Sequence, residues 1–300
     1  MTRISQIQVI KLLKIYGYSL VRINRDQFNR LNGILKDRQG KRYFFKVVND
    51  QDIYSFNSLF NEANVSRYLG KLSHQKIVSF KGYRLKIPLV KKIIKKDGIV
   101  CLISNLVEGN SLLTKPSQFQ ARILEITLEQ LLLLNRLFVR SPVDQYLIKY
   151  TKNDLLLSLP RKLIKAVLTS PSDAVSLIKI ALNFLKSIAF TGYHNALIHA
   201  DLNASNIILK GKTIYLTDWE EVGWGISTYN IVGPLCVHWQ TRVIRNKIFM
   251  YLQKTKQNTL AVPLLAHKVL ILFNQKMDRS HPKRVRDLKL LRYLIKTRSL

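Results

Sequence analysis

The chain has 300 residues and a formal net charge of +31, from 49 Lys+Arg against 18 Asp+Glu. A hydrophobic share of 47% and a charged share of 22% exclude a disordered chain and predict a folded protein with a sizeable core. The two cysteines lack ligand-like spacing, which excludes a disulfide framework and a zinc site. No apolar run is long enough to span a membrane. We therefore expect a cytoplasmic protein.

The N-terminal third predicts a strand followed by a helix. Aromatic and β-branched residues over 42–48, RYFFKVV, predict a strand that contains Lys46. Apolar residues at helical spacing over 56–68 predict a helix that contains Glu62. In a chain this rich in lysine, an exposed strand face is the alternative position for Lys46.

A hairpin and a series of helices follow. Strand-like runs over 89–94 and 99–105 flank an Asp97-Gly98 turn, and the second strand leads into 105–110, NLVEGN. From residue 111 onward the spacing of apolar residues is helical. The predicted helices of this part are 118–138, 174–190, 242–253, 262–273 and 288–295.

The segment 199–221, HADLNASNIILKGKTIYLTDWEE, has the spacing that phosphoryl transfer requires. In His-x-Asp-x-x-x-x-Asn, Asp201 can orient an attacking hydroxyl and Asn206 can bind a metal ion. The runs 207–209 and 213–216 predict a hairpin, which places Asn206 and Asp218 at its two outer ends. Their oxygens suit Mg²⁺, so the sequence predicts a shared metal site.

This segment resembles the catalytic core of the aminoglycoside phosphotransferase and choline kinase family, within the protein-kinase-like superfamily. Asp218-Trp219 stands where protein kinases have DFG, while Ala200 and Asn203 depart from the family pattern H-G-D-L-H-x-x-N-I-L. Asn230 aligns with a family Asp that braces the catalytic loop, and an Asn can still form hydrogen bonds there.

The resemblance implies an α+β, protein-kinase-like, two-lobed fold. Residues 1–104 would form a small nucleotide-binding lobe, made of an antiparallel sheet plus a helix. Residues 105–110 would be a hinge, and 111–300 a larger, mainly helical lobe for catalysis and acceptor binding. The implied function is ATP-dependent transfer of the γ-phosphoryl group to a hydroxyl of a small molecule: a sugar, a glycan or an amino alcohol.

The resemblance also assigns roles in catalysis. Asp201 would be the catalytic base, and Asn206 the catalytic residue that, with Asp218, holds Mg²⁺ on the phosphates of ATP. His199 would be structural and would hydrogen-bond to nearby backbone.

Four further residues would bind the nucleotide. Lys46 would position the α- and β-phosphates, and Glu62 would pair it, because a buried lysine is costly without a partner. Asn105 and Leu106 would offer backbone groups to adenine. The glycine pattern G-x-G-x-x-G is missing, so cover for the phosphates would come from backbone amides or from Asn29 and Arg30.

The charge distribution bears on the acceptor. Five of the 18 acids lie in the proposed site: Glu62, Asp201, Asp218, Glu220 and Glu221. Residues 227–300 hold 15 basic and 2 acidic residues, a field that repels polycationic aminoglycosides. We therefore expect an anionic or neutral acceptor rather than a polycationic one, and an anionic membrane surface is a second possible partner. A lysine bias of the whole proteome is an equal alternative explanation of the charge.

Two other functions stay open. One is a pseudokinase, which has the fold and binds a ligand without chemistry. The other is a basic protein that binds nucleic acid or a membrane surface, although no specific nucleic-acid motif is present. A protein kinase is disfavoured by the Asp218-Trp219 pair and the lack of an A-P-E motif.

Overall fold

A computed structural model describes residues 5–27, 30–49, 52–187, 194–275 and 277–296. The chain forms two compact units. Unit 1 is assembled from Met1–Ser111, Arg136–Leu147 and Asn206–Val222. Unit 2 is assembled from Leu112–Asn135, Ile148–Ser205 and Gly223–Leu300. The lobe boundaries that the sequence suggested, at 104 and 110, remain a proposal.

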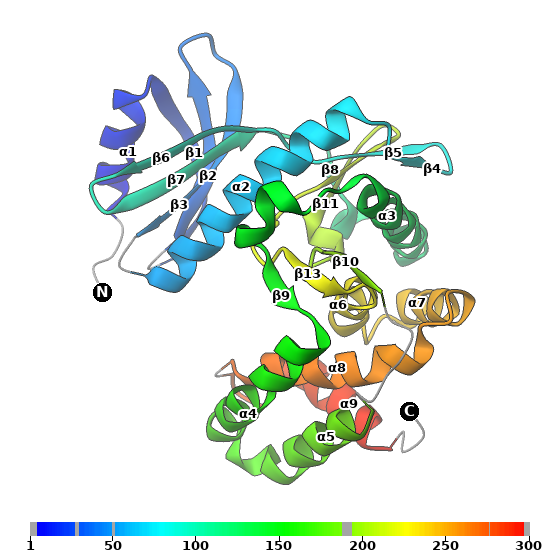
Figure 1. The fold of residues 1–300 in the computed structure, drawn as a ribbon. Coiled ribbons are helices and arrows are strands. Elements are labelled where there is room, and N and C mark those ends of the chain that lie inside the picture. The colour runs from blue at the N-terminus through cyan, green and yellow to red at the C-terminus, as the bar shows by residue number, and fades with distance from the viewer. Residues whose placement is uncertain (1–4, 28–29, 50–51, 188–193, 276, 297–300) are drawn as a thin grey trace. The chain divides into compact units, whose positions relative to one another are not determined.

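Unit 1 contains two sheets and two long helices (Figure 1). The first sheet is antiparallel in the order β1-β2-β3-β7-β6, and the second has the order β4-β5-β12-β11-β8. The elements are α1 (Gln6–Ile15), β1 (Tyr18–Gln27), β2 (Arg30–Asp37), β3 (Arg42–Asn49), α2 (Ile53–Gln75), β4 (Ser79–Phe80), β5 (Tyr83–Lys86), β6 (Val90–Lys96), β7 (Ile99–Asn105), β8 (Asn110–Ser111), the 3₁₀ helix η2 (Ser141–Tyr146), β11 (Ile207–Lys210) and β12 (Thr213–Leu216).

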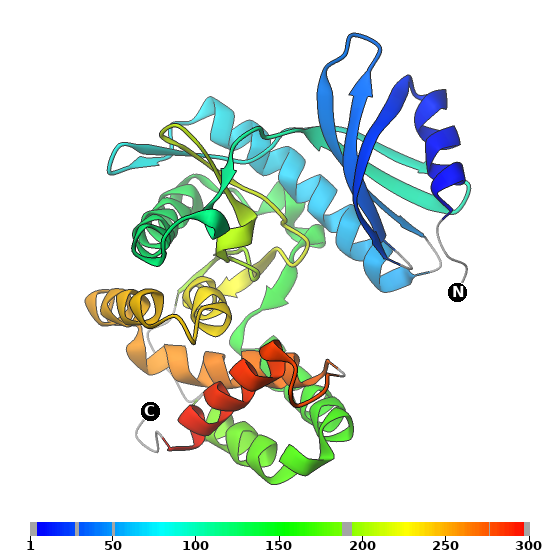
Figure 2. The same ribbon diagram turned by 180° about the vertical axis from the view of Figure 1, so that it is seen from behind.

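Strand alternation decides which side chains of the first sheet face which helix. Along β3, Phe45 and Val47 are buried in one core cluster with residues of α1. Val48 is buried in another cluster, with Leu59 of α2. Figures 1 and 2 show α1 and α2 on opposite faces of this sheet. Lys46, two residues before Val48, therefore belongs to the α2 face.

Both predicted hairpins are present. β6 and β7 pair antiparallel around Asp97 and Gly98, whose φ angles of 51° and 73° are those of a tight hairpin turn. β11 and β12 pair antiparallel, with Lys210 opposite Thr213 and with Gly211 at φ 57°. These local turns fix the register of each hairpin.

Unit 2 is mainly helical and includes a small sheet in the order β10-β13-β9. Its elements are η1 (Leu112–Thr114), α3 (Ser117–Leu137), β9 (Ile148–Tyr150), α4 (Lys152–Thr169), η3 (Pro171–Asp173), α5 (Ala174–Ser187), β10 (Asn195–Ile198), η4 (Ala204–Asn206), β13 (Gly223–Ile226), α6 (Tyr229–Val237), α7 (Arg242–Lys254), α8 (Asn258–Phe273) and α9 (Pro282–Lys296). α3 and η4 each extend by a residue or two into unit 1.

The predicted helices 118–138, 242–253 and 262–273 are confirmed, and α9 begins six residues before the predicted 288. Of the predicted helix 174–190, residues 188–190 lie outside the described part of the chain. The helices α4 and α6 are absent from the prediction. Each contains a proline, Pro160 and Pro234, which normally ends a helical pattern.

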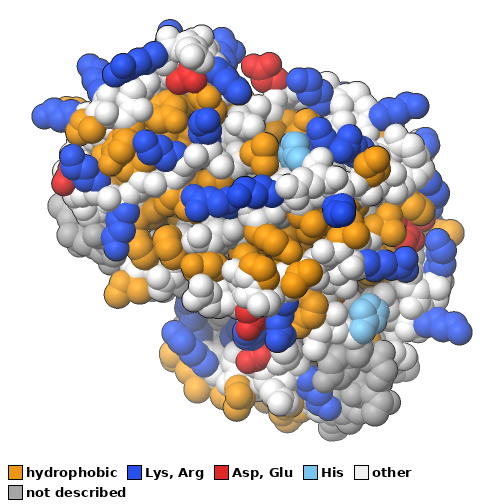
Figure 3. Space-filling view, turned by 45° about the horizontal axis from the view of Figure 1, so that its top comes forward, with side chains coloured by type: hydrophobic (Ala, Val, Ile, Leu, Met, Phe, Trp, Pro, Cys, Tyr) orange, Lys and Arg blue, Asp and Glu red, His pale blue; other side chains and the backbone are white. Residues whose placement is uncertain are grey.

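The fold class is thus the expected one, with an antiparallel sheet and its helices in unit 1 and a mainly helical unit 2. Figure 3 shows Lys and Arg side chains spread over the face in view, with few Asp or Glu among them. Among the helices of the described residues, none combines the length and the apolar character that crossing a bilayer requires.

Candidate functional site

A cavity of about 260 Å³ opens in unit 1. Its polar walls come from α2, from the end of β7 and from the two ends of the β11–β12 hairpin. Phe44, Val90, Leu102 and Ile208 form an apolar part. The sequence-predicted residues that line it are Lys46, Glu62, Asn105, Leu106, Asn206 and Asp218. Of the predicted site residues, Asp201 alone belongs to unit 2.

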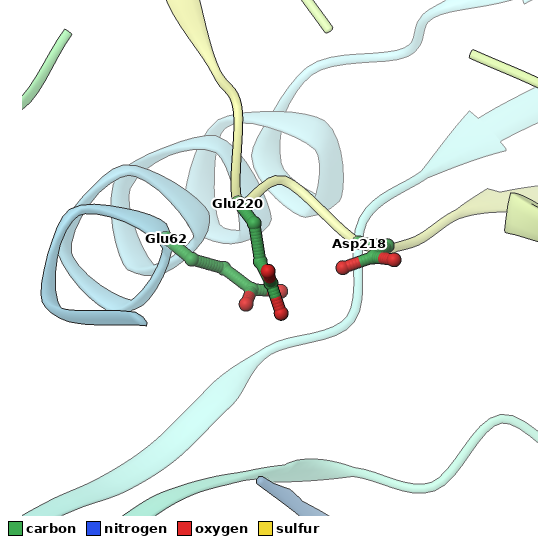
Figure 4. A group of neighbouring side chains, drawn as sticks. All are labelled: Glu62, Asp218 and Glu220. Carbon is green, nitrogen blue, oxygen red and sulfur yellow. The ribbon is translucent and has the colours of Figure 1, made fainter. Parts of the chain in front are cut away.

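Three carboxylates surround the ammonium group of Lys46. Its Nζ lies 2.8 Å from Glu62 Oε2, 2.6 Å from Asp218 Oδ1 and 3.1 Å from Glu220 Oε1. Figure 4 shows the three carboxyl groups turned toward one another. The Lys46 side chain is only 14% exposed. The pairing with Glu62 is the predicted one, whereas the sequence analysis did not connect Glu220 with Lys46.

The electrostatics of this cluster follow from burial and mutual attraction. Burial by itself lowers the pKa of Lys46, but the carboxylates of Glu62, Asp218 and Glu220 outweigh it, so the pKa stands above its usual value. Burial raises the pKa of Glu62; Lys46 opposes this rise, and Asp218 and Glu220 add to it, so the pKa stays raised. Lys46 is therefore held as a cation, and Glu62 depends on it to remain an anion.

Arg30, at the start of β2, holds Glu220 from its other side. Its Nη1 lies 2.6 Å from Glu220 Oε2, and its Nε donates to Ser55 Oγ at 3.2 Å. The hydroxyl of Ser58 donates to the backbone carbonyl of Glu220 at 3.3 Å. Arg30 was a candidate for covering the phosphates, and it is 32% exposed beside the site. Asn29, the other candidate, lies outside the described residues.

The oxygen-rich ends of the hairpin suit a divalent cation. Asn206 is buried, and its backbone carbonyl accepts hydrogen bonds from the N–H and the hydroxyl of Thr217, at 2.9 and 3.1 Å. Asp218 follows directly, with a left-handed φ of 62°, and is 38% exposed on the cavity wall. Carboxylate and amide oxygens are the hard donors that Mg²⁺ prefers, so these residues fit that ion. One oxygen each from Glu62, Asp218 and Glu220 also lie within 4.8 Å of one another.

The end of β7 differs from the expectation in one detail. Asn105 lines the cavity, but its backbone N–H already donates to the carbonyl of Leu89 at 2.9 Å. Leu106 and Val107 follow it along the same wall. Val107 was not singled out by the sequence, because a strand followed by a turn carries no mark of which backbone groups stay unused.

Asp201 lies in a tightly bonded loop of unit 2. Its N–H donates to the carbonyl of His199 at 2.8 Å, and its own carbonyl accepts from Asn203 Nδ2 at 3.1 Å. Asn203 Oδ1 accepts from the N–H of Ser205 at 2.8 Å. Ala200 has a left-handed φ of 60°, which is costly for a residue with a Cβ. The family glycine at this position would adopt that angle without strain.

Asn230 on α6 braces this loop through both ends of its side-chain amide. Its Oδ1 accepts from the N–H of His199 at 2.8 Å, and its Nδ2 donates to the carbonyl of Leu197 at 2.8 Å. The side chain is buried, so each of these bonds replaces one that water would have supplied. The amide of Asn230 therefore satisfies one donor and one acceptor of the backbone.

Two further side chains of unit 2 hold the same loop. Lys268, which is buried, donates from Nζ to the carbonyl of Ala200 at 3.1 Å. His238 Nε2 accepts from the N–H of Ala204 at 3.4 Å, which requires that nitrogen to be unprotonated. Burial, and then the positive charge of Arg286, lowers the pKa of His238 to about 4. Neither side chain belongs to a motif: Lys268 comes from α8 and His238 from the turn that follows α6, both far along the chain.

Solved structures of antibiotic-modifying kinases share this fold. A thermostable mutant of aminoglycoside phosphotransferase APH(4)-Ia, in a ternary complex with AMP-PNP and hygromycin B, matches with a TM-score of 0.73 at 14% identity, over 97% of this chain and 99% of that one. Amicoumacin kinase hAmiN, in complex with AMP-PNP and Ca²⁺, matches with a TM-score of 0.68 at 14% identity, over 99% and 95%. Spectinomycin phosphotransferase APH(9)-Ia, in complex with ADP and spectinomycin, matches with 0.59 at 14% identity, over 99% and 95%. The chain matches no protein-family model and no curated protein sequence.

Removal of Lys46 should destabilise unit 1. Lys46→Met leaves Glu62 buried without its cation, and we expect a loss of about 3–5 kcal/mol in the free energy of unfolding, measured by urea denaturation. The double variant Lys46→Met/Glu62→Gln should recover part of that loss, because no uncompensated charge is left between the two positions. The exposed Lys96→Met is the matched control, with a change within about 0.5 kcal/mol. A double variant as unstable as the sum of the two single variants would contradict the coupling.

Asn230→Asp tests the bracing of the loop that carries Asp201. A carboxylate can accept from His199 but cannot donate to Leu197, so we expect a loss of about 1–3 kcal/mol by urea denaturation near neutral pH. Protonation restores the donor, so the loss relative to wild type should shrink at about pH 4. The same change at the exposed Asn195 should alter stability by less than about 0.5 kcal/mol. An equal loss at both pH values would argue against the donor role.

The pKa of His238 predicts a dependence of stability on pH. Because the pKa is about 4 in the folded chain and about 6.5 when unfolded, the stabilisation is fully present above pH 6.5 and is lost as the pH falls toward 4. His238→Gln keeps an acceptor that does not titrate, so its melting temperature should fall less over that window. His267, whose pKa burial also lowers, should leave a residual slope. The exposed His194→Gln is the control; a variant slope equal to that of wild type would exclude His238.

Proposed function

This chain has the fold of the aminoglycoside phosphotransferases, as its sequence resemblance implied, and on that premise we propose that it is an ATP-dependent phosphotransferase. It would transfer the γ-phosphoryl group to a hydroxyl of a small molecule. The observation that carries the proposal is the buried Lys46, which faces three carboxylates at the wall of a cavity that also has an apolar part. If Lys46 served only as part of a structural ion pair, neither the adjacent cavity nor a third carboxylate would be required.

The cavity supports nucleotide binding in two ways. Phe44, Val90, Leu102 and Ile208 offer apolar surface to a base, and backbone groups near the end of β7 would orient it. Because the N–H of Asn105 already donates to the carbonyl of Leu89, hydrogen bonds to the base would come from Leu106 and its successor in the chain. Lys46 would donate to phosphate oxygens, and its pairing with Glu62 fixes its direction.

Asp218 and Asn206 are the proposed Mg²⁺ ligands. Bound there, Mg²⁺ would neutralise negative charge on the phosphate oxygens. In the structure Asp218 instead contacts Lys46, and Glu220 does so as well. Glu220 can keep Lys46 paired when Asp218 serves a metal ion, and Arg30 keeps Glu220 in place. We therefore add Glu220 and Arg30 to the residues that position the phosphates.

Asp201 is the proposed base. Its carboxylate would accept the proton of the acceptor hydroxyl as the new O–P bond forms and the bond from the γ-phosphorus to the β–γ bridging oxygen breaks, so that ADP leaves with the electron pair. Support comes from the sequence spacing to Asn206 and from the loop that Asn230, Lys268 and His238 hold in place. A rigid loop suits a group that must orient a hydroxyl.

The charge of the chain bears on the class of acceptor. The net charge of +31 favours an anionic or neutral acceptor. The structural neighbours do not support this preference, because hygromycin B, bound in one of them, is a polycationic aminoglycoside. The acceptor panel therefore has to include both kinds of molecule.

ATP turnover tests the proposal. The wild-type protein, with Mg²⁺ and a panel of phosphorylated sugars, neutral sugars, amino alcohols and aminoglycosides, should release ADP with at least one acceptor. Asp201→Asn and Asp218→Ala should each lower kcat at least about a hundredfold. The exposed turn variant Asp97→Asn makes a matched carboxylate change and should keep full activity.

Two results would reject the proposal. Activity that survives both site changes would remove Asp201 and Asp218 from the mechanism. Binding of Mg-ATP in a thermal-shift assay, without turnover of any acceptor, would favour a pseudokinase.

A further inference from the structure

Helices α4 and α5 of unit 2 each present apolar side chains to solvent. Each set recurs at three-, four- or seven-residue spacing and so occupies one face of its helix. The exposed fractions are Leu157 81%, Ile164 60% and Leu168 74% on α4, and Val175 68%, Ile178 44%, Leu182 50% and Leu185 46% on α5. We call these residues the α4–α5 stripes.

The core of unit 2 does not account for these stripes. The core uses other positions of the same helices, such as Leu155 and Leu159 on α4 and Leu177 and Phe184 on α5, all of which are buried. The two helices contact each other, as Figure 1 shows, so the two stripes belong to one helical layer. Single exposed apolar residues need no explanation, but two aligned rows on neighbouring helices do.

The charges around the stripes are almost all positive. Arg161, Lys165 and Lys179 are exposed on the same two helices. From α4 through α5 the acids are Asp154, which accepts a hydrogen bond from the hydroxyl of Thr151, and Asp173, which Arg279 pairs at 2.7 Å. The combination is an apolar surface with a basic border and no exposed, unpaired acid within the described residues of that stretch.

We infer that the α4–α5 stripes are a docking surface for an anionic lipid bilayer, on which both helices lie flat. The hydrocarbon region of a bilayer would bury the leucine and isoleucine side chains. Its negative head groups would attract Arg161, Lys165 and Lys179. A second copy of the chain fits less well, because each copy carries a net charge of +31 and would repel the other. The inference does not rest on the proposed catalytic function.

Co-sedimentation with vesicles tests this surface. The wild-type protein should bind vesicles of phosphatidylglycerol and phosphatidylcholine in equal parts, bind phosphatidylcholine alone at least about tenfold more weakly, and lose affinity as salt is raised. The triple variant Leu157→Ser/Leu168→Ser/Leu182→Ser should bind the mixed vesicles at least about tenfold more weakly.

A second triple variant removes the charges and keeps the apolar stripes. Arg161→Gln/Lys165→Gln/Lys179→Gln should also bind the mixed vesicles at least about tenfold more weakly, and its binding should depend less on salt. Circular dichroism melting curves like that of wild type would show that both variants fold.

The matched control is Ile7→Ser/Ile77→Ser/Val139→Ser, which removes three residues that are 64%, 74% and 58% exposed elsewhere. It should bind like wild type, within about twofold. Equal binding of the apolar triple variant and this control would overturn the proposal, as would absence of vesicle binding by the wild type. A dimer that the apolar triple variant dissociates, without vesicle binding, would assign the surface to a second copy and overturn it as well.

Discussion

The constraint on which the site depends is the burial of one ammonium group, that of Lys46. Strand alternation in β3 commits this side chain to the face of the sheet that α2 covers, and a lysine there is costly unless carboxylates surround it. Glu62 supplies one from α2, while Asp218 and Glu220 supply two more from the segment after β12. One interaction therefore joins a sheet, a helix and a hairpin that are far apart in the sequence. The same interaction gathers carboxylate oxygens in one place, as a divalent cation would require.

In unit 2 a comparable constraint comes from buried backbone groups that need hydrogen-bond partners. The loop that carries Asp201 turns sharply, with Ala200 in a left-handed conformation, and its buried N–H and carbonyl groups need partners. Asn230 satisfies two of them, while Lys268 and His238 satisfy one each. Because an amide both donates and accepts, an Asn at 230 can meet a need that a carboxylate meets only in part. The departure from the family pattern is thus compatible with an ordered loop.

The large positive charge is better understood by location than by total. Three acids gather around Lys46, which pairs with all of them, and Arg30 pairs with Glu220 from its other side. On α4 and α5 the bases border an apolar surface, and the acids nearby, Asp154 and Asp173, both have hydrogen-bond partners. The same excess of Lys and Arg thus has two different consequences. Lys46 and Arg30 pair with carboxylates, whereas the exposed bases on α4 and α5 would attract an anionic partner.

The sequence by itself determined the local elements that carry the site: the strand with Lys46, the helix with Glu62, and the hairpins around Gly98 and Gly211. Period-2 and period-3.6 patterns and turn residues are written into short windows, so they can be read without the fold. Tertiary structure alone decided that Glu220 forms ion pairs with Lys46 and Arg30. It also decided that the N–H of Asn105 donates to Leu89 and that the α4–α5 stripes are exposed. The reason is physical: periodicity fixes which side chains share a face of one element, but packing among distant elements fixes which face is covered and by what.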